Sequence, residues 1–167
     1  MEFIRTNLAR LAFALGILLG VQAPNLVSQY EHRVAAHLSE VTQNFAGFQN
    51  IADQYFAGNV EALLLHHEQS SDRVFHDEGA VIRKIWDRLQ HLQHVQTQLA
   101  GGLASKMSHL AFTADADIRR ETLDGYQATV PLTADAILCG LLAGFLLGAI
   151  IEALFGGLAY VRRPRRL

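Results

Sequence analysis

The chain has 167 residues, of which 50% are hydrophobic and 18% are charged, and its formal net charge is -2. This charge argues against a nucleic-acid binder, because neutralising phosphates needs a basic surface. The single cysteine, Cys139, excludes an intrachain disulfide. The apolar residues are concentrated in two segments: residues 11–21 carry no charge, and Glu152 is the only charged residue in 136–160.

The first apolar segment, residues 8–27, is predicted to be a transmembrane helix. Arg5 and Arg10 ahead of a short apolar stretch also fit a cleavable signal peptide, with residues 21–23 resembling a cleavage site. Pro24 argues against cleavage, because its fixed φ and tertiary amide make it a poor residue just after a scissile bond. We therefore expect an uncleaved anchor, with the long side chain of Arg10 reaching toward the membrane interface.

The central region, residues 28–132, is predicted to be an all-α domain. Apolar residues in 27–55 recur at steps of three and four, which indicates a long helix with a coiled-coil-like seam. Gly58 is expected to end this helix, and Asn59 to cap a short one. A second long helix should follow a break at residues 70–72. Its apolar stripe comprises Phe75, Ile82, Ile85, Leu89, Leu92 and Leu99. Shorter helices then lead to the second apolar segment, and no alternating pattern of useful length predicts a strand.

The second apolar segment, residues 136–160, is long enough to cross a bilayer, whose hydrocarbon core needs about 20 helical residues. Thr133 is a candidate N-cap just before it. Four arginines follow it: Arg162, Arg163, Arg165 and Arg166. Because positive charge favours the cytoplasmic side, these arginines together with Arg5 and Arg10 predict that both termini are cytoplasmic.

The predicted organisation therefore has three parts. Residues 1–27 form a cytoplasmic start and the first transmembrane helix. Residues 28–132 form an extracytoplasmic helical domain, which holds all eight histidines. Residues 133–167 form the second transmembrane helix and a basic cytoplasmic tail.

Several of these features occur together in a known family. They are the basic amino terminus, the Gly-rich apolar start, Gln29 and Tyr30 after a membrane-edge Pro24, the helical middle, and the sequence Val-Pro-Leu-Thr at residues 130–133 before a Gly-rich second span. The chain resembles a family of short, uncharacterised two-pass inner-membrane proteins of Gram-negative bacteria, grouped as a domain of unknown function. The resemblance covers nearly the whole chain. It implies a location in the bacterial inner membrane and no particular activity.

Small residues recur every four positions along both spans. The second span has Gly140, Gly144, Gly148 and Gly156, with Glu152 in the same series, and the first has Ala12, Gly16 and Gly20. Such stripes allow two helix backbones to approach closely. We expect them to pack the two spans against each other within one hairpin. The alternative is contact between copies of the chain.

Glu152 is a carboxylate inside an apolar segment, where it costs about 3 kcal/mol or more unless it is paired or protonated. If Gly20 lies opposite Gly140 in an antiparallel hairpin, Glu152 falls within one turn of Arg5, and Arg10 is a second candidate partner. We expect a structural charge pair. A proton or ion path is the alternative interpretation.

The histidines raise the question of a metal site, because the spacing of His91 and His94 can place two imidazoles on one metal ion. The sequence has no HExxH or cysteine-based signature, so we expect solvated polar-face histidines, no bound metal and no cofactor. It also lacks the motifs of nucleophilic catalysis and of phosphate binding, which argues against an enzyme.

These features predict a non-enzymatic, membrane-anchored assembly or scaffold protein, acting as a homo-oligomer or as an accessory subunit of a larger membrane complex. Its expected partners are the lipid bilayer and other membrane-protein subunits, and not nucleic acid. The alternative is a sensor or an ion or proton transport component that uses Glu152 or the histidine-rich domain.

Overall fold

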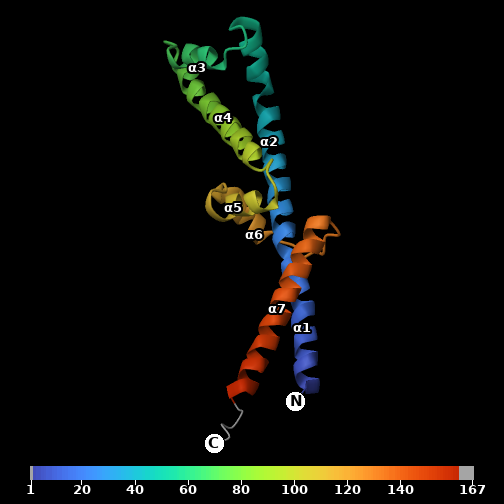
Figure 1. Cartoon of the computed structure of the whole chain (residues 1–167). Helices are drawn as coiled ribbons and strands as arrows, with labels where there is room; N and C mark the ends of the chain where they lie inside the picture. Colours follow the sequence, from blue (N-terminus) through green and yellow to red (C-terminus); the bar gives the residue numbers. More distant parts are fainter. Residues whose placement is uncertain (1, 162–167) are drawn as a thin grey trace, which may run out of the picture. The chain divides into compact units, whose positions relative to one another are not determined.

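The computed structural model describes the backbone of residues 2–161 and the side chains of residues 6–155. Every regular element in these residues is an α-helix, which confirms the all-α prediction (Figure 1). The helices are α1 (Glu2–Gly20), α2 (Gln22–Tyr55), α3 (Val60–Glu68), α4 (Arg73–Gln98), α5 (Leu103–Phe112), α6 (Ala116–Asp124) and α7 (Ala134–Val161).

The chain divides into two compact units. We call Met1–Gln29 with Thr122–Leu167 the hairpin unit, and Tyr30–Glu121 the helical unit. The helix α2 contributes its first turns to the hairpin unit and the rest of its length to the helical unit. The assignment of either unit to one side of a membrane stays a prediction.

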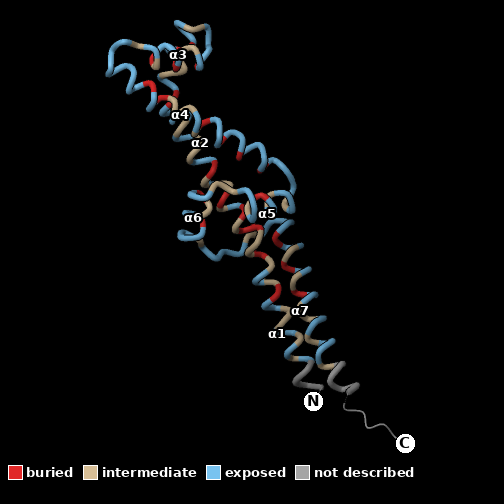
Figure 2. Tube along the Cα trace, turned by 90° about the vertical axis from the view of Figure 1, so that its left-hand side faces the viewer, coloured by how far each residue is buried: buried red, intermediate tan, exposed pale blue. Residues whose placement is uncertain are grey.

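In the hairpin unit, α1 and α7 lie side by side over most of their length (Figures 1 and 2). A one-residue break at Val21 separates α1 from α2. Pro24 falls in the first turn of α2, where a missing N–H is tolerated because that turn has no acceptor within its own helix. At the other end of the hairpin, the Oγ1 of Thr133 accepts a hydrogen bond from the Ala136 N–H at 3.3 Å, so Thr133 caps α7 as its sequence position predicts.

The helices of the helical unit begin at side-chain caps. Asn59 caps α3 by accepting from the Ala62 N–H at 3.1 Å, and Asp72 caps α4 by accepting from the Val74 N–H at 2.8 Å. The turn after α2 is tight, because Ala57 and Gly58 both have positive φ, of 51° and 81°. Glycine adopts this conformation without strain, which explains why the long helix ends here.

Two apolar clusters hold the helical unit together. The first joins α2 to α3 and α4 through Phe45, Ala52, Val60, Leu63, Leu64, Ile82 and Leu89. The second joins α2 to α4 and α6 through Tyr30, Val34, Leu92, Val95, Leu99 and Ile118. Phe75 belongs to neither cluster, although its spacing predicts that it is part of the core. It lies near the start of α4 and is 50% exposed. Val95, which the predicted stripe omits, is buried one turn before Leu99.

Candidate functional site: the glycine-lined helix hairpin

The contact between α1 and α7 depends on glycines that face one another. A Cβ added to Gly16 would lie 2.6 Å from the Cα of Gly144, and one added to Gly20 would lie 2.9 Å from the Cα of Gly140. Real Cβ atoms essentially never come this close to backbone atoms. The two backbones therefore approach to a distance that no residue other than glycine allows at these positions.

The same two glycines of α7 are also enclosed by α1 and by Val21, the residue that follows it. A Cβ on Gly144 would lie 2.9 Å from the carbonyl oxygen of Phe13, and one on Gly140 would lie 2.9 Å from Cγ1 of Val21. Beside this contact, the rings of Phe13 and Phe145 meet edge to face with their centroids 5.1 Å apart. The hairpin thus combines close backbone packing with an aromatic contact at its margin.

The tight contact does not extend along the whole stripe. A Cβ on Gly148 would lie 3.8 Å from the carbonyl oxygen of Ala9, which is an ordinary van der Waals distance. The surroundings of Gly156 lie outside the described residues. The close packing is therefore centred on Gly16 and Gly20 against Gly140 and Gly144, and α1 covers the later part of the stripe less closely.

Glu152 lies one turn beyond Gly148 on this less covered part of α7, and its side chain is exposed. Arg10 is exposed as well, and no ion pair joins these two residues among the side chains that the structure describes. The side chain of Arg5 lies outside the described residues, so its pairing with Glu152 stays a prediction.

A network of polar side chains joins the start of α2 to the segment before α7. Asn25 is 5% exposed, and its amide nitrogen donates to the Gln127 carbonyl at 3.0 Å while its amide oxygen accepts from the Thr129 hydroxyl at 3.0 Å. The Tyr126 hydroxyl donates to Oε1 of Gln22 at 2.5 Å. These bonds satisfy polar groups that burial would otherwise leave without partners.

Sequence reasoning missed this network. Its signal was the spacing of Gln22, Asn25 and Gln29, which places three amides on one face of a helix directly after an apolar segment. Gln29 exchanges two hydrogen bonds with the backbone of Gln127, its Nε2 donating to the carbonyl at 2.7 Å and its Oε1 accepting from the N–H at 3.2 Å.

The outer faces of the hairpin are apolar and exposed. Large exposed residues on α1 and α7 are Leu8, Leu11, Leu15, Leu18, Leu19, Ile137, Leu138, Leu141, Leu142, Phe145, Leu146, Ile150 and Leu154. Figure 2 shows most of the described residues of these two helices in the colours for intermediate and exposed, with only a few buried positions. The most apolar stretch of residues 134–155 is only 11% buried inside the molecule. The helix α7 is therefore not a core helix of this chain.

The two histidines considered as metal ligands bind different partners. His91 Nε2 lies 3.0 Å from Oδ2 of Asp115, whereas His94 Nε2 accepts from the Gln98 amide at 2.7 Å. Within the described part of the chain, no group of three or more histidine, cysteine, aspartate or glutamate side chains could hold a metal ion.

Asp115 is instead the centre of a structural cluster in the helical unit. Its side chain is 7% exposed and lies 2.5 Å from the Arg88 guanidinium. Burial tends to raise the pKa of this carboxyl, but hydrogen bonds from Arg88, from the Ile118 N–H and from His91 outweigh that effect and lower the pKa to about 2. The Asp115 carboxyl is therefore ionised at neutral pH.

These observations define a class: an all-helical chain with two helices that are long and apolar enough to cross a membrane. The chain belongs to the family described as "Protein of unknown function (DUF2937)", whose model matches residues 4–164. This confirms the resemblance to a domain of unknown function. No curated protein and no solved structure matches the chain.

Proposed function

We propose that the protein is a two-span inner-membrane protein that works as a non-enzymatic assembly or scaffold protein. In this proposal α1 and α7 cross the bilayer as a hairpin, both termini are cytoplasmic and the helical unit is extracytoplasmic. The exposed leucines and phenylalanines of the hairpin support the membrane assignment, because a monomer in water would leave an unusually large apolar surface exposed. The arginines near both ends support the orientation.

The close packing of α1 against α7 supports an uncleaved first span. A signal peptide is removed from the mature protein and has no lasting partner there. In contrast, Gly16 and Gly20 make backbone contacts with Gly140 and Gly144 that require glycine on both helices. Removal of α1 would leave these two glycines of α7 as an open groove in the bilayer.

The observation that carries the assembly role is the exposed Glu152 beside the loosely covered Gly148. A carboxylate facing lipid costs about 3 kcal/mol or more. A small-residue surface next to it allows another helix to approach and to supply a hydrogen-bond partner, which removes that cost. The occupant is a helix of a second copy or of another membrane subunit.

The assembly proposal predicts that gentle extraction yields a species larger than one chain by native mass measurement. Gly148→Leu adds bulk to the face that receives the partner, and should reduce the oligomer or complex strongly. Glu152→Gln keeps the shape and much of the hydrogen bonding, and should have a milder effect. Ala153→Leu is the matched control, because Ala153 is exposed and is not three or four positions from either Gly148 or Glu152, so it points to a different side of the helix.

A wild-type protein that has the mass of a single chain, with no other chain co-purifying, would contradict the assembly role. Transport would be favoured instead if Gly148→Leu left the assembly unchanged while a folded Glu152→Gln protein lost a cellular phenotype.

A further inference from the structure

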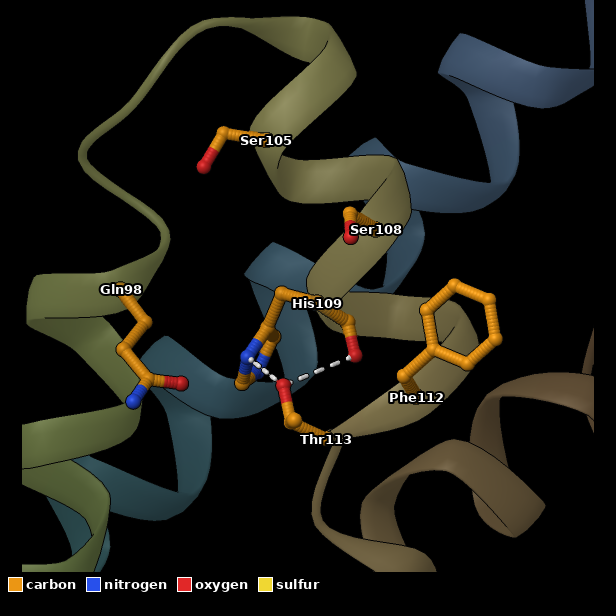
Figure 3. A pocket seen from close by; sticks show the side chains of 6 residues that line it. All are labelled: Gln98, Ser105, Ser108, His109, Phe112 and Thr113. Atoms are coloured by element: carbon orange, nitrogen blue, oxygen red, sulfur yellow. Dashed lines mark hydrogen bonds between the residues drawn. The ribbon is translucent and has the colours of Figure 1, made fainter.

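The hollow of about 450 Å³ between the end of α4 and α5 keeps its one histidine out of reach of a ligand (Figure 3). The hydroxyl of Thr113 lies 2.8 Å from Nδ1 of His109, and Nε2 of the same ring is buried. The other residues that line the hollow are exposed: Gln98, Ser105, Ser108 and Phe112. The hollow therefore lacks the convergent polar groups that fix a small molecule in its site.

In contrast, the linker between α6 and α7, residues 125–133, presents apolar side chains to its surroundings. Leu132 is 86% exposed, which is the highest value among the large apolar residues whose side chains the structure describes, and Val130 is 55% exposed. The linker contains no charged residue, and neither does the stretch 11–29 that includes the start of α2. These segments of the hairpin unit therefore lack the ionised side chains that are typical of a surface in water.

Hydrogen bonds to the start of α2 hold the linker beside the first turn of α7. A Cβ on Gly140 would lie 2.9 Å from Cγ1 of Val21, so these two residues are at the same level of the antiparallel hairpin. Asn25 is one helical turn beyond Val21, at the level of the first turn of α7. Its amide oxygen accepts from the Thr129 hydroxyl at 3.0 Å. The linker therefore folds back along α7 instead of extending beyond its start.

This arrangement makes the linker continuous with the apolar outer surface of α7. Ile137 and Leu138 are 50% and 57% exposed just after the helix start, and Val130 and Leu132 lie at about the same level on the linker. Asp135 is exposed in the first turn of α7, and a carboxylate is costly in the hydrocarbon core, so this level stays within reach of water. It therefore corresponds to the boundary between lipid headgroups and acyl chains.

We propose that the linker, residues 125–133, is an interfacial anchor that inserts Val130 and Leu132 among the headgroups and outer acyl chains of the bilayer. The partner of this surface is lipid. The inference rests on the proposed function, because it needs α7 to cross the membrane. It extends the membrane-contacting part of the chain from α7 to the linker, and the Asn25 network is what keeps the linker at that level.

The experiment uses the full-length Cys139→Ser protein in vesicles of phosphatidylcholine and phosphatidylglycerol. A nitroxide is attached to a single cysteine in Val130→Cys or Leu132→Cys. Its collision rates are measured with oxygen, which concentrates in acyl chains, and with a water-soluble nickel complex, which acyl chains exclude. Leu142→Cys, on the exposed face of α7, is the lipid reference, and Ser71→Cys, in the exposed turn between α3 and α4, is the water reference.

The ratio of oxygen to nickel collisions at both linker sites should lie between the two references, about twofold or more above that of Ser71→Cys, because water is only partly excluded at the interface. Adding Leu132→Asp to the labelled Val130→Cys protein should lower its ratio to that of Ser71→Cys, since a carboxylate avoids the acyl region. Leu132→Met keeps the apolar character and should leave the ratio unchanged. Leu132 is so exposed that neither substitution should disturb the fold.

Four results would overturn the interfacial anchor while Leu142→Cys still reports lipid and the membrane hairpin stands. They are linker ratios equal to that of Ser71→Cys, linker ratios equal to that of Leu142→Cys, low collision rates with both reagents, which would show that protein covers the linker, and equal ratios in Leu132→Asp and Leu132→Met. If Leu142→Cys has the ratio of Ser71→Cys, α7 does not lie in lipid. The proposed membrane topology then fails, and the interfacial anchor fails with it.

Discussion

At the scale of single residues, Asp115 is the side chain on which the helical unit depends most clearly. Its Oδ1 accepts from the Ile118 N–H at 3.0 Å and so caps α6, while its Oδ2 binds Arg88 and His91. Its own backbone N–H donates to the buried Tyr30 hydroxyl at 3.0 Å. One residue therefore connects α2, α4 and α6 through polar contacts.

Asp115→Asn removes the charge but keeps a good N-cap, because asparagine caps helices about as well as aspartate. We expect a loss of about 1–2 kcal/mol in the free energy of unfolding, since hydrogen bonds to charged groups contribute about 1.5–3 kcal/mol and Arg88 is partly exposed to solvent. Asp115→Ala also removes the cap and should cost about 1 kcal/mol more. Chemical unfolding followed by circular dichroism measures both losses.

The pH dependence of stability provides a second readout for the same residue. The pKa of Asp115 is about 2 in the folded protein and 3.8 as the ordinary value, so its contribution is present above pH 3.8 and is lost as the pH falls toward 2. This part of the acid dependence should be missing from Asp115→Asn. Equal acid dependence in the two proteins would show that the cluster does not contribute in this way.

At the scale of helices, much of the fold could be predicted, because the signals are local. Asn59, Asp72 and Thr133 cap helices within three residues of themselves, and sequence spacing is enough to place them. The Asn25 network could not be predicted in the same way. Its partners, such as Gln127, are about a hundred residues away in the chain, and only the packing of α1 against α7 brings them together.

The contact between the glycine stripes could be predicted from the sequence only in part. Their four-residue spacing suggests which faces meet, and the structure has Gly16 against Gly144 and Gly20 against Gly140. The spacing does not reveal that the contact loosens at Gly148, because the angle between two helices depends on all the side chains between them. For the same reason, the exposure of Glu152 does not follow from the sequence.

A matched pair of glycine substitutions tests the close packing. Gly16→Ala places a Cβ 2.6 Å from the Cα of Gly144, so the helices must move apart, and we expect a loss of about 1–3 kcal/mol. Gly47→Ala is the control, because Gly47 lies within α2 with no atom within 4 Å of the added Cβ. That change should stabilise α2 by about 0.5–1 kcal/mol. Thermal unfolding in detergent distinguishes them, and equal effects would show that the α1 contact does not need glycine.

At the scale of the whole molecule, the proposed topology has α1 and α7 crossing a membrane as a hairpin, with the helical unit outside the cytoplasm and both termini inside. Single-cysteine labelling of the Cys139→Ser protein in intact cells tests it most directly. A cysteine placed at Ser71, an exposed residue between α3 and α4, should react with a membrane-impermeant maleimide from outside. A cysteine placed at Leu167 should react only after the membrane is opened. Labelling of the Leu167 site in intact cells, or protection of the Ser71 site until permeabilisation, would contradict the account.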